Sequence, residues 1–178
     1  MKTKNLLVVL FIVLLFTGCG AMKLEDFNET SPKFVVKDYF NGELKAYGLV
    51  KDRSGKIIKS FKAKMIGSWD EDGVGTLDEY FVYNNGEKQR RVWTLIPSKN
   101  KNEYIGTASD IVGQGILKSN GNTVMIDYTM EVPYNDSTIN IDVKDWLHLQ
   151  EDGVIINHSK MKKFGFTVGE LVITIIKQ

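Results

Sequence analysis

Three charged side chains, Glu79, Arg91 and Asp145, stand where the sequence otherwise predicts the apolar faces of strands. Glu79 and Arg91 lie on the two arms of a hairpin. Its loop, Asn84–Gly86, suits a three-residue turn with the glycine in the left-handed conformation. Such a turn places Glu79 opposite Arg91, which shares its strand face with Trp93, whereas a two-residue turn would break this pairing. Charges on an apolar face can pair with each other, orient a ligand or transfer protons.

These charges have three interpretations, which the sequence leaves open. In the first, Glu79 and Arg91 neutralise each other in a filled core and Asp145 joins them. In the second, they line a barrel cavity and orient the polar end of a ligand. In the third, Glu79 or Asp145 is a general acid or base; no nucleophile–base–orienter set is visible, so we assign no catalytic residue. A void of about 300 Å3 or more that reaches Glu79 or Arg91 would favour the second interpretation.

The candidate ligand-binding residues are the three charged side chains and two neighbouring tryptophans: Glu79, Arg91, Trp93, Asp145 and Trp146. Packing in the core or at the rim is the alternative role for the tryptophans. We expect His148 and His158 on the solvent side of their strands. Because the chain has two histidines and one cysteine, we expect neither a metal site nor a cofactor.

The elements that must position these residues are β-strands. Apolar and polar residues alternate over residues 123–132 and 139–149, which is typical of strands with one face in a core. Polar turn signals recur about every ten residues. The pattern predicts an all-β chain of eight to ten strands, closed into one antiparallel up-and-down, lipocalin-like barrel. A two-sheet β-sandwich is the alternative fold. Residues 35–40 fit one turn of helix or a first strand equally well.

Cys19, the only cysteine, follows Leu15-Phe16-Thr17-Gly18 behind an apolar run of eleven residues. Two lysines precede the run, which is too short for a membrane-spanning helix of about 20 residues. The motif resembles the bacterial lipobox, with Phe16 where leucine is usual. We therefore predict a lipoprotein signal peptide at 1–18, a lipidated N-terminus and tether at 19–33, and one β-barrel domain at 34–178. Lipidated Cys19 would attach the chain to a membrane.

Composition restricts the partners and the compartment. Removal of residues 1–18, with two lysines, changes the formal charge from +1 to about −1, so the chain lacks the basic excess that nucleic-acid binding requires. A lone cysteine excludes an intramolecular disulfide bond. The residue after Cys19 is Gly20 and not the aspartate associated with inner-membrane retention. We therefore expect a bacterial envelope lipoprotein in the outer membrane, facing the periplasm.

Six short motifs, in one order, resemble the Gram-negative lipoprotein family known as domain of unknown function 3833. The resemblance covers about residues 34–178 and rests on the stretches at 40–42, 75–79, 91–93, 104–108, 145–146 and 162–165. It implies an envelope lipoprotein loosely associated with genes of fatty-acid modification. It implies no catalytic residues, because the family has no established activity.

The leading functional hypothesis is an envelope lipoprotein that binds or carries a fatty acid or similar lipophilic ligand inside its barrel. The first alternative is a non-enzymatic envelope assembly module with a filled core and an unknown protein partner. The second is a lipid-modifying enzyme that uses Glu79 or Asp145. Of these, an enzyme is the least favoured.

Overall fold

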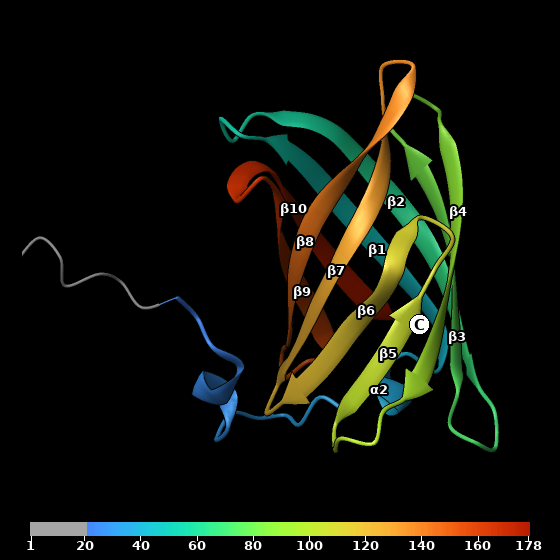
Figure 1. Cartoon of the computed structure of the whole chain (residues 1–178). Coiled ribbons are helices and arrows are strands. Elements are labelled where there is room, and N and C mark those ends of the chain that lie inside the picture. The colour runs from blue at the N-terminus through green and yellow to red at the C-terminus, as the bar shows by residue number, and fades with distance from the viewer. Residues whose placement is uncertain (1–20) are drawn as a thin grey trace, which may run out of the picture.

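The structure, a computed structural model, describes residues 21–178. Cys19 and the predicted signal peptide lie outside the described residues. Ten strands follow two short helices (Figure 1). The elements are the 3-10 helix η1 (Leu24–Phe27), the helix α2 (Val36–Tyr39), and the strands β1 (Gly42–Asp52), β2 (Ile57–Trp69), β3 (Gly75–Tyr83), β4 (Lys88–Pro97), β5 (Glu103–Thr107), β6 (Ile111–Asn120), β7 (Thr123–Tyr134), β8 (Ser137–Leu149), β9 (Val154–Lys163) and β10 (Phe166–Lys177).

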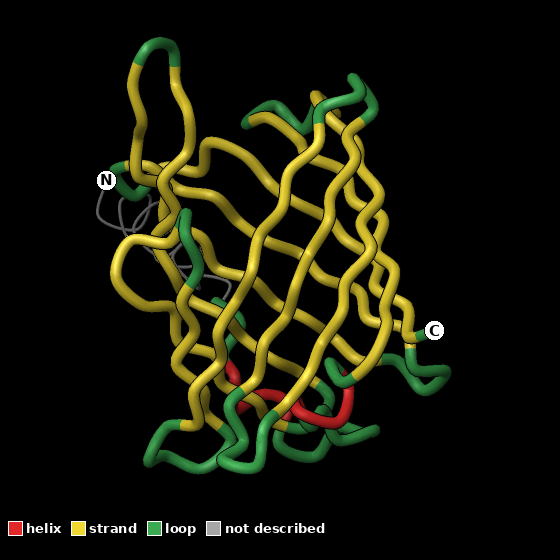
Figure 2. The backbone as a smooth tube through the Cα atoms, turned by 90° about the vertical axis from the view of Figure 1, so that its right-hand side faces the viewer, coloured by secondary structure: helices red, strands yellow, loops and turns green. Residues whose placement is uncertain are grey.

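Each strand pairs antiparallel with its neighbours in sequence, and β1 also pairs with β10 (Figure 2). The sheet is therefore closed, and no strand is left with an unpaired edge along its whole length. This confirms the predicted up-and-down barrel at the upper end of the expected strand number. The alternative, a two-sheet sandwich, is wrong. No helix within residues 21–178 is long and apolar enough to cross a membrane.

The β3–β4 hairpin has the predicted register. Glu79 pairs with Arg91, and Leu77 pairs with Trp93. Gly86 adopts a φ of 83°, and the Tyr83 N–H donates to the Glu87 carbonyl at 2.9 Å, which together define the three-residue turn. The loop sequence therefore fixed the register of two buried rows, because a shift by one residue would turn every side chain to the other face.

Helix α2 closes one end of the barrel, so residues 35–40 form a helical turn and not a strand. Phe34, Val36, Tyr39 and Phe40 are all buried there. The Tyr39 hydroxyl lies 2.7 Å from the Gly153 carbonyl oxygen, which holds the helix against the turn after β8. Hairpin turns alternate between the two ends, so the turns after β1, β3, β5, β7 and β9 lie toward the opposite end.

Residues 24–34 do not form a free tether. Phe27 packs on the outer wall against Trp146 and His148, with ring centroids 6.2 and 5.2 Å apart. The Asn122 N–H donates to Thr30 Oγ1 at 3.0 Å, and the segment follows the closed end of the barrel. The expected tether at 19–33 therefore includes a docked segment, which covers a wall that alternation alone predicts to face solvent. His148 is accordingly half-buried rather than solvated.

Candidate ligand-binding site

The barrel encloses a cavity of about 710 Å3. Inward-facing side chains of every strand except β5 line it. Phe40 lies at the closed end, whereas Lys59 and Glu87 belong to the opposite end, near the turns after β1 and β3. The cavity is well above the threshold of about 300 Å3 set for a binding barrel, and it reaches both Glu79 and Arg91.

The lining is mainly aromatic and aliphatic. Phe61, Phe81 and Tyr83 form a group of edge-to-face and stacked rings on β2 and β3. Deeper, Trp93 meets Tyr128 edge to face, with centroids 5.5 Å apart. Aromatic rings in such a position offer large apolar contact area to a ligand chain. These rings lie on the inward faces of their strands, as the period-two alternation of the sequence predicts.

Glu79 lies within this apolar lining and is only 7% exposed. Its Oε2 atom has no hydrogen-bond partner within the described residues. Burial raises the pKa of Glu79 to about 7, and the nearby Arg91 guanidinium only partly offsets that rise. A carboxyl group in this state exchanges its proton near neutral pH.

Arg91 pairs with Asp110 and not with Glu79. Its Nη2 lies 2.6 Å and its Nε 3.0 Å from Asp110 Oδ2, which is the geometry of a two-nitrogen clamp. Asp110 reaches the guanidinium from the turn between β5 and β6. The Glu131 N–H fixes that turn by donating to the Asp110 carbonyl at 2.8 Å. The predicted neutralisation of Glu79 by Arg91 as a direct ion pair is therefore wrong, because Asp110 occupies the guanidinium.

Asp145 occupies the inner face of β8, and its Oδ2 accepts a hydrogen bond of 3.3 Å from the Tyr128 hydroxyl. Its Oδ1 has no partner among the described residues. The nearby Ser159 hydroxyl donates instead to Asn157 Oδ1 at 3.1 Å. Burial raises the pKa of Asp145 to about 6. Glu79 and Asp145 are thus two carboxyl groups beside Arg91 that form no ion pair with it among the described residues.

Four of the five candidate residues line the cavity: Glu79, Arg91, Trp93 and Asp145. Trp146 does not, because it follows Asp145 on the same strand and so points to the outer wall, where Phe27 covers it. The assignment of Trp146 as a ligand-binding residue is therefore corrected. His158 is also on the outside, with Nε2 3.6 Å from Glu170.

Sequence reasoning missed Asp110 and Tyr128. Tyr128 is predictable from the sequence, because its hydroxyl lies in an apolar row and a buried phenol needs a hydrogen-bond partner. Asp110 is not predictable in this way, since aspartate is common in turns whether or not it has a functional role. Three of the carboxyl groups that line the cavity, Glu79, Asp110 and Asp145, lie around the single guanidinium of Arg91.

Comparison with known proteins agrees with this architecture. The S-type phycobiliprotein lyase CPES from Guillardia theta has a similar structure, with a TM-score of 0.54 and 8% sequence identity. The similarity covers 87% of this chain and 91% of the lyase, and at this identity it establishes the lipocalin-like fold alone. The search of curated proteins found no match. Residues 13–177 match the family described as "Protein of unknown function (DUF3833)", and the chain therefore belongs to that family.

Proposed function

We propose that this protein binds or carries one fatty acid or similar small lipophilic ligand inside its barrel. The observation that carries the proposal is the cavity of about 710 Å3, apolar over most of its lining and provided with one polar cluster. Ligand sites generally have this composition and lie in the range of about 300–1,000 Å3. The ring group of Phe61, Phe81 and Tyr83 supplies contact area for an apolar chain.

Binding is tested with residues 21–178, which contain every strand and the docked segment. Native mass spectrometry after gentle purification from the original host should show a bound lipophilic molecule. Ile173→Trp fills the cavity and should reduce uptake of a fluorescent fatty acid at least about tenfold. Ile156→Trp, on the exposed outer face, is the matched control. Recovery of empty protein only, with no displacement of the fluorescent probe, would overturn the proposal.

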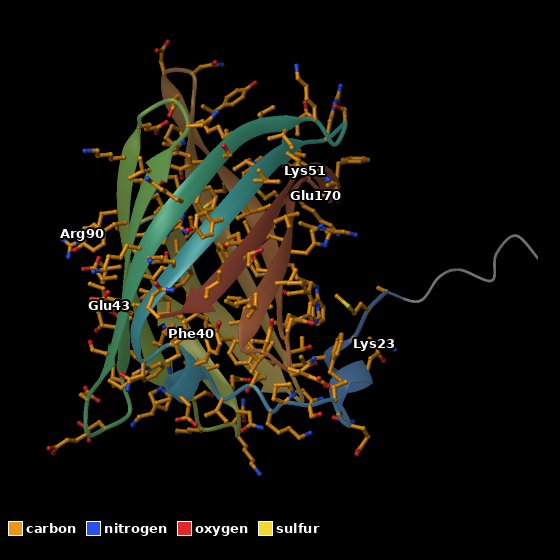
Figure 3. The ribbon with its side chains drawn as sticks, turned by 180° about the vertical axis from the view of Figure 1, so that it is seen from behind. Lys23, Phe40, Glu43, Lys51, Arg90 and Glu170 are labelled. Atoms are coloured by element: carbon orange, nitrogen blue, oxygen red, sulfur yellow. The ribbon has the colours of Figure 1, made fainter. Side chains whose placement is uncertain are left out.

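We also propose that Cys19 carries the lipid anchor of an outer-membrane lipoprotein that faces the periplasm. The lipobox-like sequence supports this proposal. Lys23, close to the start of the described residues, lies nearer the closed end, whereas Lys51 and Glu170 lie near the other (Figure 3). Cys19→Ala should abolish incorporation of labelled fatty acid and release the protein from membranes; unchanged labelling would refute it.

A lipid-modifying enzyme is the second candidate, favoured by the raised pKa values of Glu79 and Asp145. Strains carrying Glu79→Gln and Asp145→Asn test it: altered cellular lipids with folded protein would support catalysis. Unchanged lipids would dismiss it. The assembly module with a filled core has no comparable support, because the barrel interior is hollow.

A further inference from the structure

Most hydrogen-bond donors of the polar cluster are already engaged. Arg91 directs its Nε and Nη2 atoms to Asp110, and Nη2 also lies 3.2 Å from the Met130 sulfur. The Tyr128 hydroxyl donates its single proton to Asp145. Arg91 Nη1 has no hydrogen-bond partner among the described residues, but the Asp110 carboxylate already neutralises the guanidinium to which it belongs.

The acceptors of the same cluster are not engaged. Glu79 Oε2 and Asp145 Oδ1 are buried without partners among the described residues. Both carboxyls interact electrostatically with Arg91, and Asp145 also acts on Glu79, so the two groups share one region of the cavity. A buried acceptor without a donor destabilises the protein, and native structures contain few of them.

The charge count agrees with the hydrogen bonds. Three carboxyl groups and one guanidinium give the cluster an acidic balance whenever Glu79 or Asp145 is ionised. An anionic head group placed there would meet repulsion in a medium of low dielectric constant. A head group that donates protons would instead satisfy both oxygens and, if cationic, reduce the charge.

We propose that the ligand is an amphiphile whose polar group is a hydrogen-bond donor, a hydroxyl or a protonated amine, held by Glu79 and Asp145. This inference rests on the proposed binding function and narrows its ligand class. A simple fatty acid is then a poorer ligand than an alcohol or amine of equal chain length.

The experiment compares dodecylamine, dodecanol and dodecanoate as competitors of the neutral dye N-phenyl-1-naphthylamine at pH 8, on residues 21–178. The amine and the alcohol should displace the dye at concentrations at least about tenfold lower than dodecanoate, since one hydrogen bond to a charged group has that effect. The double variant Glu79→Gln, Asp145→Asn should remove this preference. Asp127→Asn, on the exposed outer wall, should keep it.

The outcomes separate this inference from the proposed function. Displacement by dodecanoate equal to or better than the amine and alcohol overturns the donor inference and leaves ligand binding intact. No binding of the dye or of any competitor overturns both. If the double variant fails to fold by circular dichroism, the single variants carry the test, and an unchanged preference in both refutes the assignment to Glu79 and Asp145.

A second, independent observation concerns the open end. Phe164, in the β9–β10 turn, and Phe166, the first residue of β10, are 85% and 77% exposed. Ile57 and Ile58, the first residues of β2, are 53% and 55% exposed. The two turns are neighbours because β1 pairs with β10 up to Asp52. Four large apolar side chains thus form one corner of the cavity rim.

Charge surrounds this apolar corner. Residues 51–58 and 163–170 contain four basic and two acidic side chains. The Asp52 side chain is hydrogen-bonded within its own turn, where Oδ1 accepts from the Ser54 and Lys56 N–H groups. Glu170 pairs with Lys51 at 3.3 Å. The two stretches therefore carry an excess of two positive charges, with Arg53, Lys56 and Lys163 as the remaining basic side chains. Exposed phenylalanines flanked by basic residues match the chemistry of anionic bilayer surfaces.

We infer that this corner docks on a bilayer rich in anionic phospholipid and so brings the cavity mouth to a source of amphiphiles. Residues 21–178, which lack the predicted lipid anchor, should co-sediment with phosphatidylglycerol-containing vesicles, and less so as salt rises. Phe164→Ser with Phe166→Ser should abolish binding. Tyr47→Ser, on the outer wall and 53% exposed, should not. Equal binding to pure phosphatidylcholine vesicles, no binding, or an unaffected double variant would overturn the inference.

Discussion

Substitution of Glu79 by glutamine should stabilise the barrel above neutral pH. Glu79 has a pKa of about 7 in the folded protein, against 4.5 for the ordinary side chain, because burial disfavours its charged form. The unfolded chain therefore releases this proton first, so the free energy of unfolding falls as pH rises from about 4.5 to about 7 and then levels off. Glutamine is neutral at every pH and removes this loss.

The size of the effect follows from the change in pKa. One pKa unit corresponds to about 1.4 kcal/mol, so the full loss in the free energy of unfolding is about 3 kcal/mol. Between about 2 and 3 kcal/mol of this loss occurs between pH 5 and pH 8. Glu79→Gln and the parent protein should thus differ much more at pH 8 than at pH 5. Groups that do not interact with Glu79 titrate alike in both proteins, so their contributions cancel in the comparison.

Urea unfolding of residues 21–178 at both pH values measures this difference, followed by tryptophan fluorescence. Asp127→Asn, whose carboxylate lies 2.9 Å from Lys144 on the outer wall, is the control and should change stability by less than about 1 kcal/mol at either pH. A stability difference between Glu79→Gln and the parent that is the same at pH 5 and pH 8 would refute the burial argument.

Three further predictions concern contacts that only the folded chain reveals. Asp110→Ala should lower the free energy of unfolding by about 3 kcal/mol, because it leaves the Arg91 charge without its ion-pair partner. Adding Arg91→Leu should restore part of that loss, and urea unfolding measures both effects. Gly121→Ala should make residues 24–33 sensitive to protease while the barrel stays intact, since its Cβ would lie 1.9 Å from the Phe27 carbonyl oxygen; unchanged cleavage would contradict the docking. Gly67→Ala should lower the melting temperature, because its Cβ would lie 1.5 Å from the Phe40 carbonyl oxygen at the closed end, and a neutral effect would argue against that close approach.

Much of the fold and part of the site could be predicted because they depend on local rules. Period-two alternation assigned the inward rows of β3, β4, β7 and β8, and the Asn84–Gly86 loop fixed which residues oppose each other. Glu79 and Asp145 were found because a charge in an apolar row is visible in one dimension. Trp146 is a candidate because it belongs to the same family motif as Asp145, but alternation along β8 places it on the other face.

The sequence by itself determined the strand order, the register of the central hairpin and the presence of acids on apolar faces, since each follows from neighbours a few residues apart. Only the tertiary structure decided how those acids are partnered. Asp110 lies in a turn 19 residues beyond Arg91 and forms the ion pair with the Arg91 guanidinium, although the strand register places Glu79 opposite Arg91. The closed barrel of ten strands also has a hollow interior. The width of a barrel depends on its strand number and tilt, so no local sequence pattern shows whether the inward-facing side chains fill it.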